Sequence, residues 1–507
     1  MLFRDRICAV VAAPTAREMA RQLREALKLT RTVELRLDWL RSVNQDIDFL
    51  GWLPMRSNAA RIATCRRKAN GGRYRKSVHE QSATLLSYVL GGCSWCDIEV
   101  ETLQFYESLG LQFPKDLMER IRKHAKVIVS FHDFRRTPRS LNSILHRLER
   151  CGGDAIKIAT QCNSIADSLR VLALAKGRRN VVAVPMGDAG LPARVLALRH
   201  CSALAYAAVG EKTAPGQLTL DEMKNLYRAD KLDRRTRVYG VIGNPVGHSL
   251  SPLMQNVGFQ ACRLNAVYLP FLVKGLPDFL QAIAPLGIAG FSVTLPHKER
   301  ILRHLDDCDP LARAIGAVNT VVVRGGGKLY GYNTDYVGVL RALERRVQLR
   351  GSRVLLHGAG GAARAAAFAL AQGGAVVCIC ARRRARARAL ARAVGGEVVE
   401  RRRLRREFFD AIVNCTPVGM HPRANASPLR AEELNCRLVM DLIYRPRKTR
   451  LLQLAERRGI ETVSGVEMFL AQGSAQWEIW TGLRAPVAAM RRAVLQALRR
   501  EEKKSGQ

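Results

Sequence analysis

The chain has 507 residues, more than a single hydrophobic core usually serves, so two or three domains are expected. Its 82 Lys and Arg residues outnumber 44 Asp and Glu residues and give a formal charge of +38, which attracts anions from nucleic acid to small carboxylates and phosphates. No apolar run approaches the roughly 18–20 residues that span a bilayer, which excludes a transmembrane helix, and thirteen cysteines scattered through apolar segments favour a reducing cytoplasm.

The first predicted domain, residues 1–228, alternates short β-rich runs with helical patterns. Its N-terminal apolar run is soon interrupted by charge and leads into a helical pattern, so we interpret it as a strand rather than a signal peptide. Eight strand–helix units in this length predict a (β/α)8 barrel. The predicted strands are residues 6–13, 32–40, 60–66, 95–101, 126–133, 154–160, 180–187 and 204–210.

Several of these strands carry charge where a barrel interior is expected. Glu34, Arg36 and Asp38 share one face of the second strand, and inward-facing charge is costly unless it serves a site. Lys157 lies between two isoleucines near the end of the sixth strand. Burial disfavours the charged form of an amine and makes it a better nucleophile. A structural ion pair of Lys157 with Asp154 or Glu34 is an equally good interpretation of the spacing.

A histidine one strand away favours the catalytic interpretation. His132 ends the fifth predicted strand. An amine that forms a Schiff base turns a ketone into an electron sink, and a nearby imidazole can remove the adjacent proton and return it to a leaving hydroxyl. We expect Arg36, Arg66 and Arg194 to gather around a carboxylate.

These segments resemble the type I 3-dehydroquinate dehydratase family. The matching motifs are ELRLD (34–38), TCR (64–66), DIE (97–99), SFHDF (130–134), DAIKIAT (154–160), PMG (185–187) and TAPGQ (213–217). The resemblance implies that Lys157 forms an imine with the C3 ketone of 3-dehydroquinate and that His132 is the general acid and base. Arg194 is implied to anchor the substrate carboxylate, and the other implied substrate residues are Glu34, Arg36, Arg66, Thr213 and Gln217.

The chain departs from this family's pattern at two positions. Asn70 stands before Gly71 and Gly72, where the family usually has a glutamate that helps to poise the histidine. This change affects the expected pH optimum and rate. Thr213 replaces the usual serine and keeps the hydroxyl.

A polar, charged stretch at residues 229–238 predicts a linker to a second α/β region. Ser249 and Ser251 follow a turn rich in Gly and Pro, and two hydroxyls on one side of an extended loop suit a small carboxylate, although ordinary turn serines fit as well. Lys298, Asn319 and Asp335 come directly after predicted strands, where the ligand sites of α/β folds collect. A Lys–Asp salt bridge without a catalytic role is the alternative.

A glycine-rich turn, HGAGGAARA (357–365), follows a predicted strand and begins a helix, so its backbone amides can receive a pyrophosphate. After the next strand the chain has Arg382 where NAD enzymes carry an acidic residue, which favours the 2′-phosphate of NADPH. Arg386 is predicted to share a helix face with Arg382.

These motifs, with VNCTPVGM (413–420), DLIYRP (441–446) and GVEMFLAQGSAQWEIWTG (465–482), resemble the shikimate dehydrogenase family. The resemblance implies that Lys298 protonates the C3 carbonyl oxygen as hydride arrives and that Asp335 orients this lysine. The implied substrate residues are Ser249, Ser251, Thr294, Asn319, Tyr444 and Gln472. The implied NADP-binding residues are Gly358, Ala359, Gly360, Gly361, Ala362, Arg382, Arg386, Thr416, Leu442 and Gly465.

The predicted organisation is therefore a barrel (1–228), a substrate-binding α/β domain (237–336), a Rossmann-like NADP-binding domain (337–470) and C-terminal helices returning to the substrate-binding domain (471–498). A polar tail (501–507) is expected to stay unpacked.

The two resemblances name consecutive reactions, so we expect a bifunctional enzyme of the shikimate pathway. It would act on 3-dehydroquinate, 3-dehydroshikimate and shikimate, with no nucleic acid, membrane or metal partner, and its oligomeric state stays open. One alternative is a second half that uses quinate or shikimate with NAD. The other is a nucleic-acid binder with degenerate enzyme domains, which the 6% aromatic content and the absence of aromatics from 380–406 disfavour. Cys93 and Cys96 have redox or metal spacing, but without a second pair we expect buried thiols.

Overall fold

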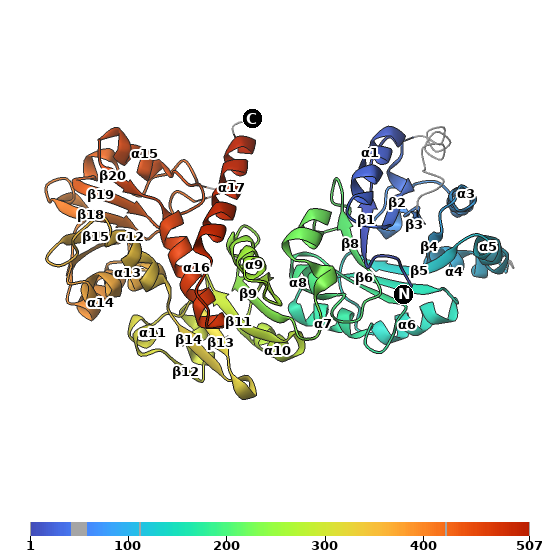
Figure 1. The fold of residues 1–507 in the computed structure, drawn as a ribbon, viewed down its shortest axis with the longest axis horizontal. Coiled ribbons are helices and arrows are strands. Elements are labelled where there is room, and N and C mark those ends of the chain that lie inside the picture. Colours follow the sequence, from blue (N-terminus) through green and yellow to red (C-terminus); the bar gives the residue numbers. More distant parts are fainter. Residues whose placement is uncertain (1, 42–57, 111–112, 421–422, 506–507) are drawn as a thin grey trace. The chain divides into compact units, whose positions relative to one another are not determined.

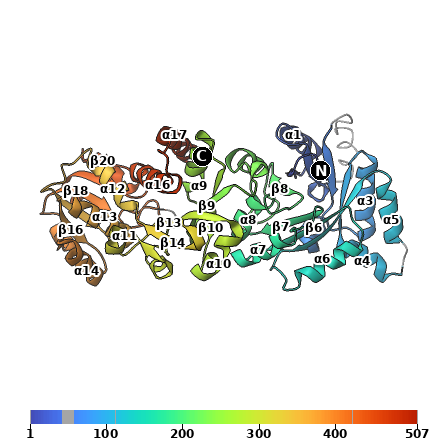
Figure 2. The ribbon, with the colours of Figure 1, turned by 60° about the horizontal axis from the view of Figure 1, so that its bottom comes forward.

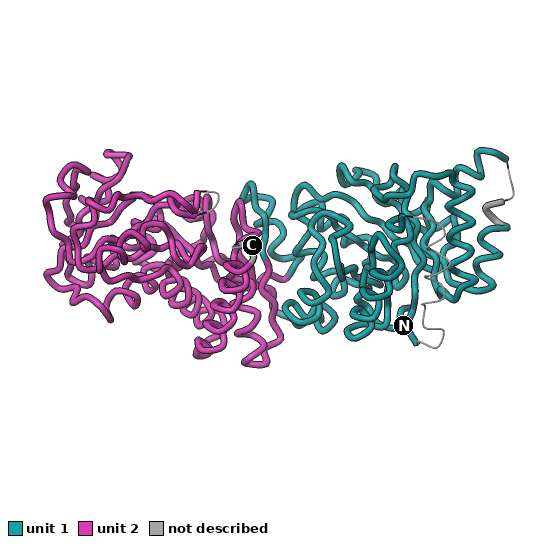
Figure 3. Tube along the Cα trace, turned by 90° about the horizontal axis from the view of Figure 1, so that it is seen from above, with its two compact units in different colours: residues 1–236, 270–286 teal, residues 237–269, 287–507 magenta. Residues whose placement is uncertain are grey.

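The computed structural model describes residues 2–41, 58–110, 113–420 and 423–505. The chain forms two compact units, residues 1–236 with 270–286 and residues 237–269 with 287–507 (Figure 3). Within the described ranges, no helix combines the length and apolar character that crossing a bilayer requires.

The first unit is built on an eight-stranded parallel sheet in the order β7-β6-β5-β4-β3-β2-β1-β8, with helices around its outside (Figures 1 and 2). Its strands are β1 (Ile7–Val11), β2 (Thr32–Arg36), β3 (Ala60–Thr64), β4 (Trp95–Glu99), β5 (Lys126–Asp133), β6 (Ala155–Gln161), β7 (Val181–Met186) and β8 (Ala205–Ala208). Its helices are α1 (Ala16–Leu27), α3 (Val78–Leu90), α4 (Val100–Ser108), α5 (Phe113–Arg122), α6 (Leu141–Arg150), α7 (Ile165–Ala173) and α8 (Leu191–Leu196).

The sheet closes almost completely into a barrel. β1 pairs in parallel with both β2 and β8. Between the last two strands, the Ala203 N–H just before β8 donates to the Val181 carbonyl in β7 at 2.8 Å. This confirms the predicted (β/α)8 barrel and the place of each predicted strand. β4 is shorter than predicted because Val100 already begins α4. β2 ends at Arg36 because residues 37–39 form a 3₁₀ helix, so Asp38 does not share the strand face of Glu34 and Arg36.

The barrel interior is divided into an apolar and a charged end. Phe3 stacks on Trp95, the first residue of β4, with ring centroids 4.4 Å apart, and joins a buried cluster that includes Ile62 and Ile128. Arg36, Thr64 and Glu99, by contrast, end their strands and are buried. The charged side chains therefore gather at the C-terminal end of the barrel, where barrel enzymes place their sites.

The second unit contains two six-stranded sheets. The first is mixed, in the order β10-β9-β11-β13-β14-β12, and β13 runs antiparallel to β11 and β14. Its strands are β9 (Arg237–Gly243), β10 (Ala266–Leu272), β11 (Ile288–Val293), β12 (Asp307–Cys308), β13 (Thr320–Val323) and β14 (Leu329–Tyr332). The helices in this stretch of the chain are α9 (Ser251–Ala261), α11 (Pro310–Ile315) and α10 (Leu276–Leu286), of which α10 belongs to the first unit.

The other sheet is parallel, and its order β17-β16-β15-β18-β19-β20 is that of a Rossmann fold. Its strands are β15 (Arg353–His357), β16 (Val376–Cys380), β17 (Glu397–Val398), β18 (Phe409–Asn414), β19 (Cys436–Asp441) and β20 (Glu461–Val463). The associated helices are α12 (Asp335–Leu343), α13 (Gly361–Gln372), α14 (Arg384–Val394), α15 (Arg450–Arg457), α16 (Gly465–Thr481) and α17 (Val487–Ser505). Helices α12, α13 and α14 pack on one face of the sheet and α15 on the other (Figure 1).

Three expectations about boundaries need correction. The predicted linker includes a short 3₁₀ helix (Ala229–Lys231), and its last two residues already belong to β9. The predicted divisions after 336 and 470 fall inside α12 and α16, because each helix continues across them. The polar tail does not stay unpacked, since α17 continues to Ser505 and Glu501 pairs with Arg445 at 2.9 Å.

Candidate active sites

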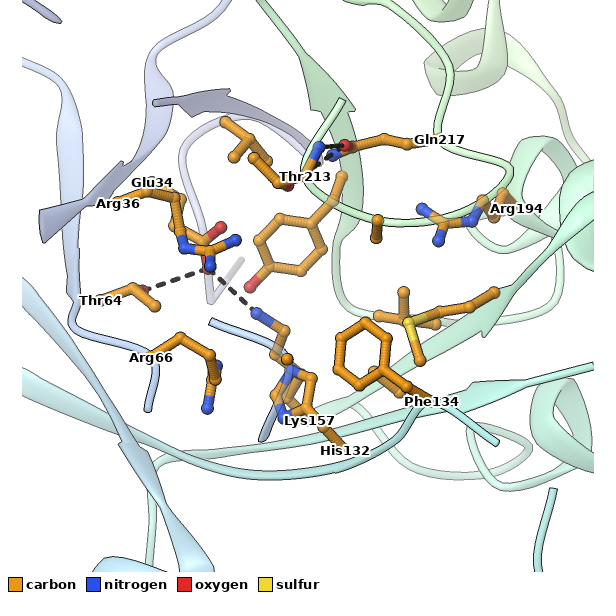
Figure 4. Close-up of a pocket in the computed structure, with 17 residues that line it drawn as sticks. Glu34, Arg36, Thr64, Arg66, His132, Phe134, Lys157, Arg194, Thr213 and Gln217 are labelled. Carbon is orange, nitrogen blue, oxygen red and sulfur yellow. Dashed lines mark hydrogen bonds and ion pairs between the residues drawn. The ribbon is translucent and has the colours of Figure 1, made fainter. Parts of the chain in front are cut away.

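A pocket opens at the C-terminal end of the barrel strands (Figure 4). All eight residues predicted for the first site line it, and their labelled side chains surround one common space. The lining residues are Val10, Glu34, Arg36, Thr64, Arg66, Gly71, His132, Phe134, Lys157, Ala159, Val184, Met186, Arg194, Tyr206, Thr213, Ala214 and Gln217.

Lys157 lies at the centre of this pocket and is only 5% exposed. Its Nζ donates to Glu34 Oε1 at 3.0 Å and to Asp97 Oδ2 at 3.1 Å. Asp154 accepts a backbone N–H of β5 instead, so of the two expected ion pairs the one with Glu34 is confirmed and the one with Asp154 is wrong. Burial alone would raise the pKa of Asp97, but the charges of Arg66 and Lys157 hold it far below its ordinary value.

His132 and Lys157 line the same pocket from neighbouring strands: Lys157 on β6 pairs with Ser130 on β5, and His132 lies two residues further along β5. Burial lowers the pKa of His132 well below its ordinary value, and the charges of Arg66 and Lys157 lower it further. The imidazole is therefore neutral and able to accept a proton. Its Nδ1 is buried and has no hydrogen-bond partner within the described ranges. Asn70, at the position where a glutamate was expected, donates its amide to Glu99 at 2.7 Å.

The three pocket arginines have different partners within the protein. Arg36 donates to both carboxylate oxygens of Asp38 at 2.9 and 2.8 Å, and Arg66 donates to Asp97 at 2.9 Å. Arg194 instead donates to two backbone carbonyls, at 2.8 and 3.1 Å, and forms no ion pair with any acidic group that the structure describes. Burial lowers the pKa of Arg194 to about 10. Arg194 is therefore the buried cation left to receive an anionic ligand.

The loop that carries Thr213 and Gln217 is held against the pocket rim. Gln217 accepts hydrogen bonds from the Thr213 N–H at 2.7 Å and hydroxyl at 3.1 Å. A Cβ at Gly216, where φ is +64°, would come within 2.2 Å of the Gly187 carbonyl oxygen, so only glycine fits there. The close approach places both side chains over the pocket.

The second candidate site is a hydrogen-bonded group of three predicted residues. Lys298 binds Oδ2 of Asp335, and Asn319 donates to Oδ1 of the same carboxylate at 2.8 Å. Asp335 begins α12, where the helix dipole favours a negative charge. Gln476 of α16, which sequence reasoning missed, donates to the Asn319 carbonyl at 3.1 Å and to Thr320 at 3.0 Å. The carboxylate is thus oriented from both sides.

The two predicted serines do not lie on an extended loop. Ser251 is the first residue of α9, and its N–H donates to Ser249 Oγ at 3.2 Å. The helix begins here because Pro252 fits its first turn. The Ser249 side chain lies near Tyr444, and that of Ser251 lies near Tyr268.

The remaining predicted substrate residues are anchored by backbone or ring contacts. Tyr444 stacks on Phe469 with ring centroids 4.3 Å apart. Gln472 donates to the Phe469 carbonyl at 2.9 Å, and the Thr294 N–H donates to a carbonyl of β9 at 3.0 Å. Arg445, which sequence reasoning also missed, donates to the His248 carbonyl at 2.8 Å and so ties the Tyr444 loop to the serine turn.

The glycine turn has the geometry of a phosphate site. Gly358 adopts φ +124°, and a Cβ there would lie 3.1 Å from Thr416 Cγ2. Around Gly360, which caps α13, a Cβ would meet no described atom within 4 Å. A Cβ at Gly361 would lie 3.8 Å from Lys298, so the turn adjoins the lysine of the second site. The turn therefore leaves open space before a twelve-residue helix.

Three further predicted positions lie beside this turn. A Cβ at Gly465 would lie 2.5 Å from the Ile443 carbonyl carbon, so glycine is required there. Thr416 Oγ1 donates to the Asn414 side chain at 2.7 Å, and the Leu442 N–H donates to the Asn414 carbonyl at 3.1 Å. The ends of β18 and β19 are thereby joined beside the turn.

The predicted shared helix face of Arg382 and Arg386 is wrong, because α14 begins only at Arg384 and Arg382 precedes its cap. Both side chains are exposed just after β16, and neither forms an ion pair within the described ranges. Arg401, in the next basic cluster, pairs with Glu433 at 2.7 Å. Arg382 and Arg386 therefore differ from such neighbours in being available to a phosphate.

The cysteines are all free thiols. Burial raises the pKa of Cys93 to about 12 and that of Cys96 well above its ordinary value, so neither is a thiolate at neutral pH. Among the described residues, no group of three or more His, Cys, Asp or Glu side chains could hold a metal ion.

Known protein families match both halves. Family models for type I 3-dehydroquinase, the shikimate dehydrogenase substrate binding domain and the shikimate 5'-dehydrogenase C-terminal domain match residues 7–234, 241–321 and 465–495. A shikimate dehydrogenase (NADP(+)) of Methanosarcina acetivorans is 43% identical over 52% of this chain and 99% of its own. A solved shikimate dehydrogenase in complex with NADP+ is 37% identical, with a TM-score of 0.50 over 53% of this chain and 97% of its own.

One relative spans both halves. The bifunctional 3-dehydroquinate dehydratase/shikimate dehydrogenase, chloroplastic, of Arabidopsis thaliana is 36% identical over 505 residues, which cover 95% of this chain and 82% of that protein. Its name gives the two activities in the order in which the matching family models follow one another along this chain. The chain therefore belongs to the family of bifunctional 3-dehydroquinate dehydratase/shikimate dehydrogenases.

Proposed function

We propose that the barrel dehydrates 3-dehydroquinate to 3-dehydroshikimate through a Schiff base on Lys157, and that the second unit reduces this product to shikimate with NADPH. The observation that carries the first step is the buried amine of Lys157 in one pocket with His132 of the neighbouring strand, and burial lowers the pKa of that imidazole. Membership of the bifunctional family supports the pairing of the two reactions.

In the dehydratase site, the Lys157 nitrogen attacks the C3 ketone and water leaves, which gives a protonated imine. His132 then removes a proton from C2, and the electrons pass toward the imine nitrogen. The hydroxyl at C1 leaves as water with the proton that His132 returns. Hydrolysis of the imine releases 3-dehydroshikimate and restores the Lys157 amine.

Arg194 anchors the substrate carboxylate in this scheme. A buried guanidinium that has only backbone carbonyls as partners gains most from a bidentate carboxylate. Arg36 and Arg66 act differently, because each already faces a carboxylate of the protein. Together with Glu34 they form the charged wall of the pocket, and the substrate hydroxyls lie against this wall.

In the dehydrogenase site, Lys298 donates a proton to the C3 carbonyl oxygen of 3-dehydroshikimate. NADPH, when bound, supplies the hydride. Asp335 holds Lys298 in position and takes part in binding a ring hydroxyl, while Asn319 fixes the carboxylate. Ser249, Ser251, Thr294, Tyr444 and Gln472 are the proposed remaining substrate contacts.

The residues around the glycine turn fit a dinucleotide phosphate. Open space at Gly360 and the N-terminus of α13 suit a pyrophosphate. Arg382 and Arg386, exposed and without ion pairs in the described chain, suit the 2′-phosphate that distinguishes NADP from NAD. Gly358, Ala359, Gly361, Ala362, Thr416, Leu442 and Gly465 complete the proposed cofactor contacts.

Thirteen free thiols support a reducing compartment, which we propose is the cytoplasm. The proposed partners are the small-molecule substrates and NADP.

Borohydride reduction tests the first step, since it converts the imine to a stable secondary amine. The full chain treated with 3-dehydroquinate and borohydride should carry the adduct on Lys157, located by peptide mass spectrometry. Lys126, at the start of β5, serves as the unmodified reference lysine. An adduct on another lysine, or none, contradicts the proposal.

Lys298→Ala tests the second step independently. It should abolish NADPH oxidation by 3-dehydroshikimate and leave the dehydration of 3-dehydroquinate at the level of the unchanged chain. Retention of NADPH oxidation would remove Lys298 from the mechanism.

A further inference from the structure

Tyr206 lines the dehydratase pocket, yet the mechanism above gives it no role. It lies on β8, is 6% exposed, and its ring centroid is 4.1 Å from the Lys157 Nζ. Its hydroxyl is buried and has no hydrogen-bond partner among the described residues. A buried unpaired hydroxyl costs free energy, so a partner gained in another state of the site would stabilise that state.

Imine formation removes hydrogen-bond donors from the centre of the pocket. The Lys157 ammonium has three N–H groups and uses two of them for Glu34 and Asp97. When the ammonium condenses with a ketone, two of its hydrogens leave in the water and the protonated imine keeps one N–H. One of the two buried carboxylates therefore loses its lysine donor.

Losing the Lys157 donor leaves Glu34 with fewer hydrogen bonds than Asp97. Asp97 also accepts from Arg66 at 2.9 Å and from the Ser130 hydroxyl at 2.6 Å. Among the residues that the structure describes, the other side-chain donor to Glu34 is the neutral Thr64 hydroxyl, at 3.1 Å, which binds the same oxygen as Lys157. Glu34 is thus the carboxylate that needs a new donor.

The Tyr206 hydroxyl is suited to be this donor. Burial, and after it the negative charge of Glu34, raises the pKa of Tyr206 well above its ordinary value, so the hydroxyl keeps its proton. The position of Lys157 Nζ, over the Tyr206 ring and 3.0 Å from Glu34, brings the ring, the amine and the carboxylate together. A ring face also attracts the positive charge that the nitrogen carries as ammonium and as imine.

We propose that the Tyr206 hydroxyl donates to Glu34 when Lys157 becomes an imine, and so replaces the donor that the lysine loses. This inference rests on the proposed function, because it requires an imine at Lys157. Tyr206 is then a positioning residue, which stabilises the covalent intermediate rather than the resting enzyme or the substrate complex.

Tyr206→Phe removes the hydroxyl and keeps the ring, and Tyr227→Phe is the matched control, since Tyr227 is also 6% exposed but does not line the pocket. With the full chain and 3-dehydroquinate, Tyr206→Phe should lower kcat about tenfold, the usual effect of a lost hydrogen bond to a charged group. KM should change less than about twofold. The fraction trapped on Lys157 by borohydride should fall, while Tyr227→Phe behaves as the unchanged chain.

A second variant distinguishes the loss of a donor to Glu34 from a general disturbance of the structure. Thr64→Val removes the other donor to Glu34, so its defect should grow when Tyr206 is also phenylalanine, beyond the product of the two single defects. An unchanged kcat and trapped fraction in Tyr206→Phe, a rise in KM alone, or strictly multiplicative defects overturn the proposal. If the unchanged chain forms no adduct on Lys157, the proposed function fails and this inference fails with it.

Discussion

Asn319 donates a hydrogen bond of 2.8 Å to Asp335, whose other carboxylate oxygen is bound by Lys298. The carboxylate therefore cannot rotate without breaking one of the two contacts. Asn319→Ala should lower shikimate oxidation by NADP+ about tenfold to a hundredfold, because a hydrogen bond to a charged group is lost. The dehydratase activity of the same variant is the internal control, and an unchanged dehydrogenase kcat would show that Lys298 alone orients Asp335.

Arg194 should contribute to substrate binding but not to the thermal stability of the barrel. Arg194→Met removes the carboxylate anchor and should raise KM for 3-dehydroquinate about a hundredfold, the effect of losing a bidentate ion pair. The same change removes a buried cation without an acidic partner in the described chain, so the melting temperature of the barrel should not fall. Arg178→Met, which breaks the half-exposed pair with Glu149, is the control and should leave KM unchanged. A lower melting temperature for Arg194→Met with an unchanged KM would make Arg194 structural.

The pH dependence of dehydration should reflect His132. Burial and the charges of Arg66 and Lys157 lower the pKa of His132. Above that pKa the imidazole is neutral and acts as a base, and this activity is lost as the pH falls through the pKa. The acidic limb of kcat/KM should therefore lie well below pH 6.5, the ordinary value for histidine. A limb at or above pH 6.5 in the unchanged chain would exclude a neutral His132 in the free enzyme.

Cofactor preference should depend on Arg382 and Arg386. Alanine at either position should raise KM for NADPH about tenfold and leave KM for NADH within about twofold, because only NADPH carries the 2′-phosphate. Arg388→Ala, a neighbouring exposed change in α14, is the matched control and should affect neither. An equal loss with both cofactors would mean that these arginines act on the part that NADPH and NADH share.

Much of the fold could be predicted because its signals are local. Each predicted barrel strand is present, and the Rossmann sheet contains the expected strand that leads into the glycine turn. The predicted domain divisions after 336 and 470 were less accurate, because nothing in the sequence shows that α12 and α16 each continue across them. The start of α14 at Arg384 was missed for the same reason, since one arginine after another gives no capping signal.

The residues of the candidate sites could be predicted, but their pairing could not. Arg36 and Asp38, two apart, share a strand face in the sequence, yet their ion pair emerges only when the turn after β2 brings the side chains together. The sequence did not single out Tyr206, because an aromatic residue in a strand is typical of the hydrophobic core. Its importance depends on Lys157, 49 positions away in the numbering and on a different strand.

The central claim is that one chain performs two consecutive reactions. The most direct test is a single assay of the purified full chain with 3-dehydroquinate and NADPH, followed by loss of NADPH absorbance and by identification of the product. The account predicts that NADPH is oxidised once dehydration has supplied 3-dehydroshikimate, and that shikimate forms in an amount equal to the NADPH consumed. In Lys298→Ala this oxidation should be lost, although 3-dehydroshikimate still accumulates. No NADPH oxidation with 3-dehydroquinate, or oxidation that does not require Lys157, would contradict it.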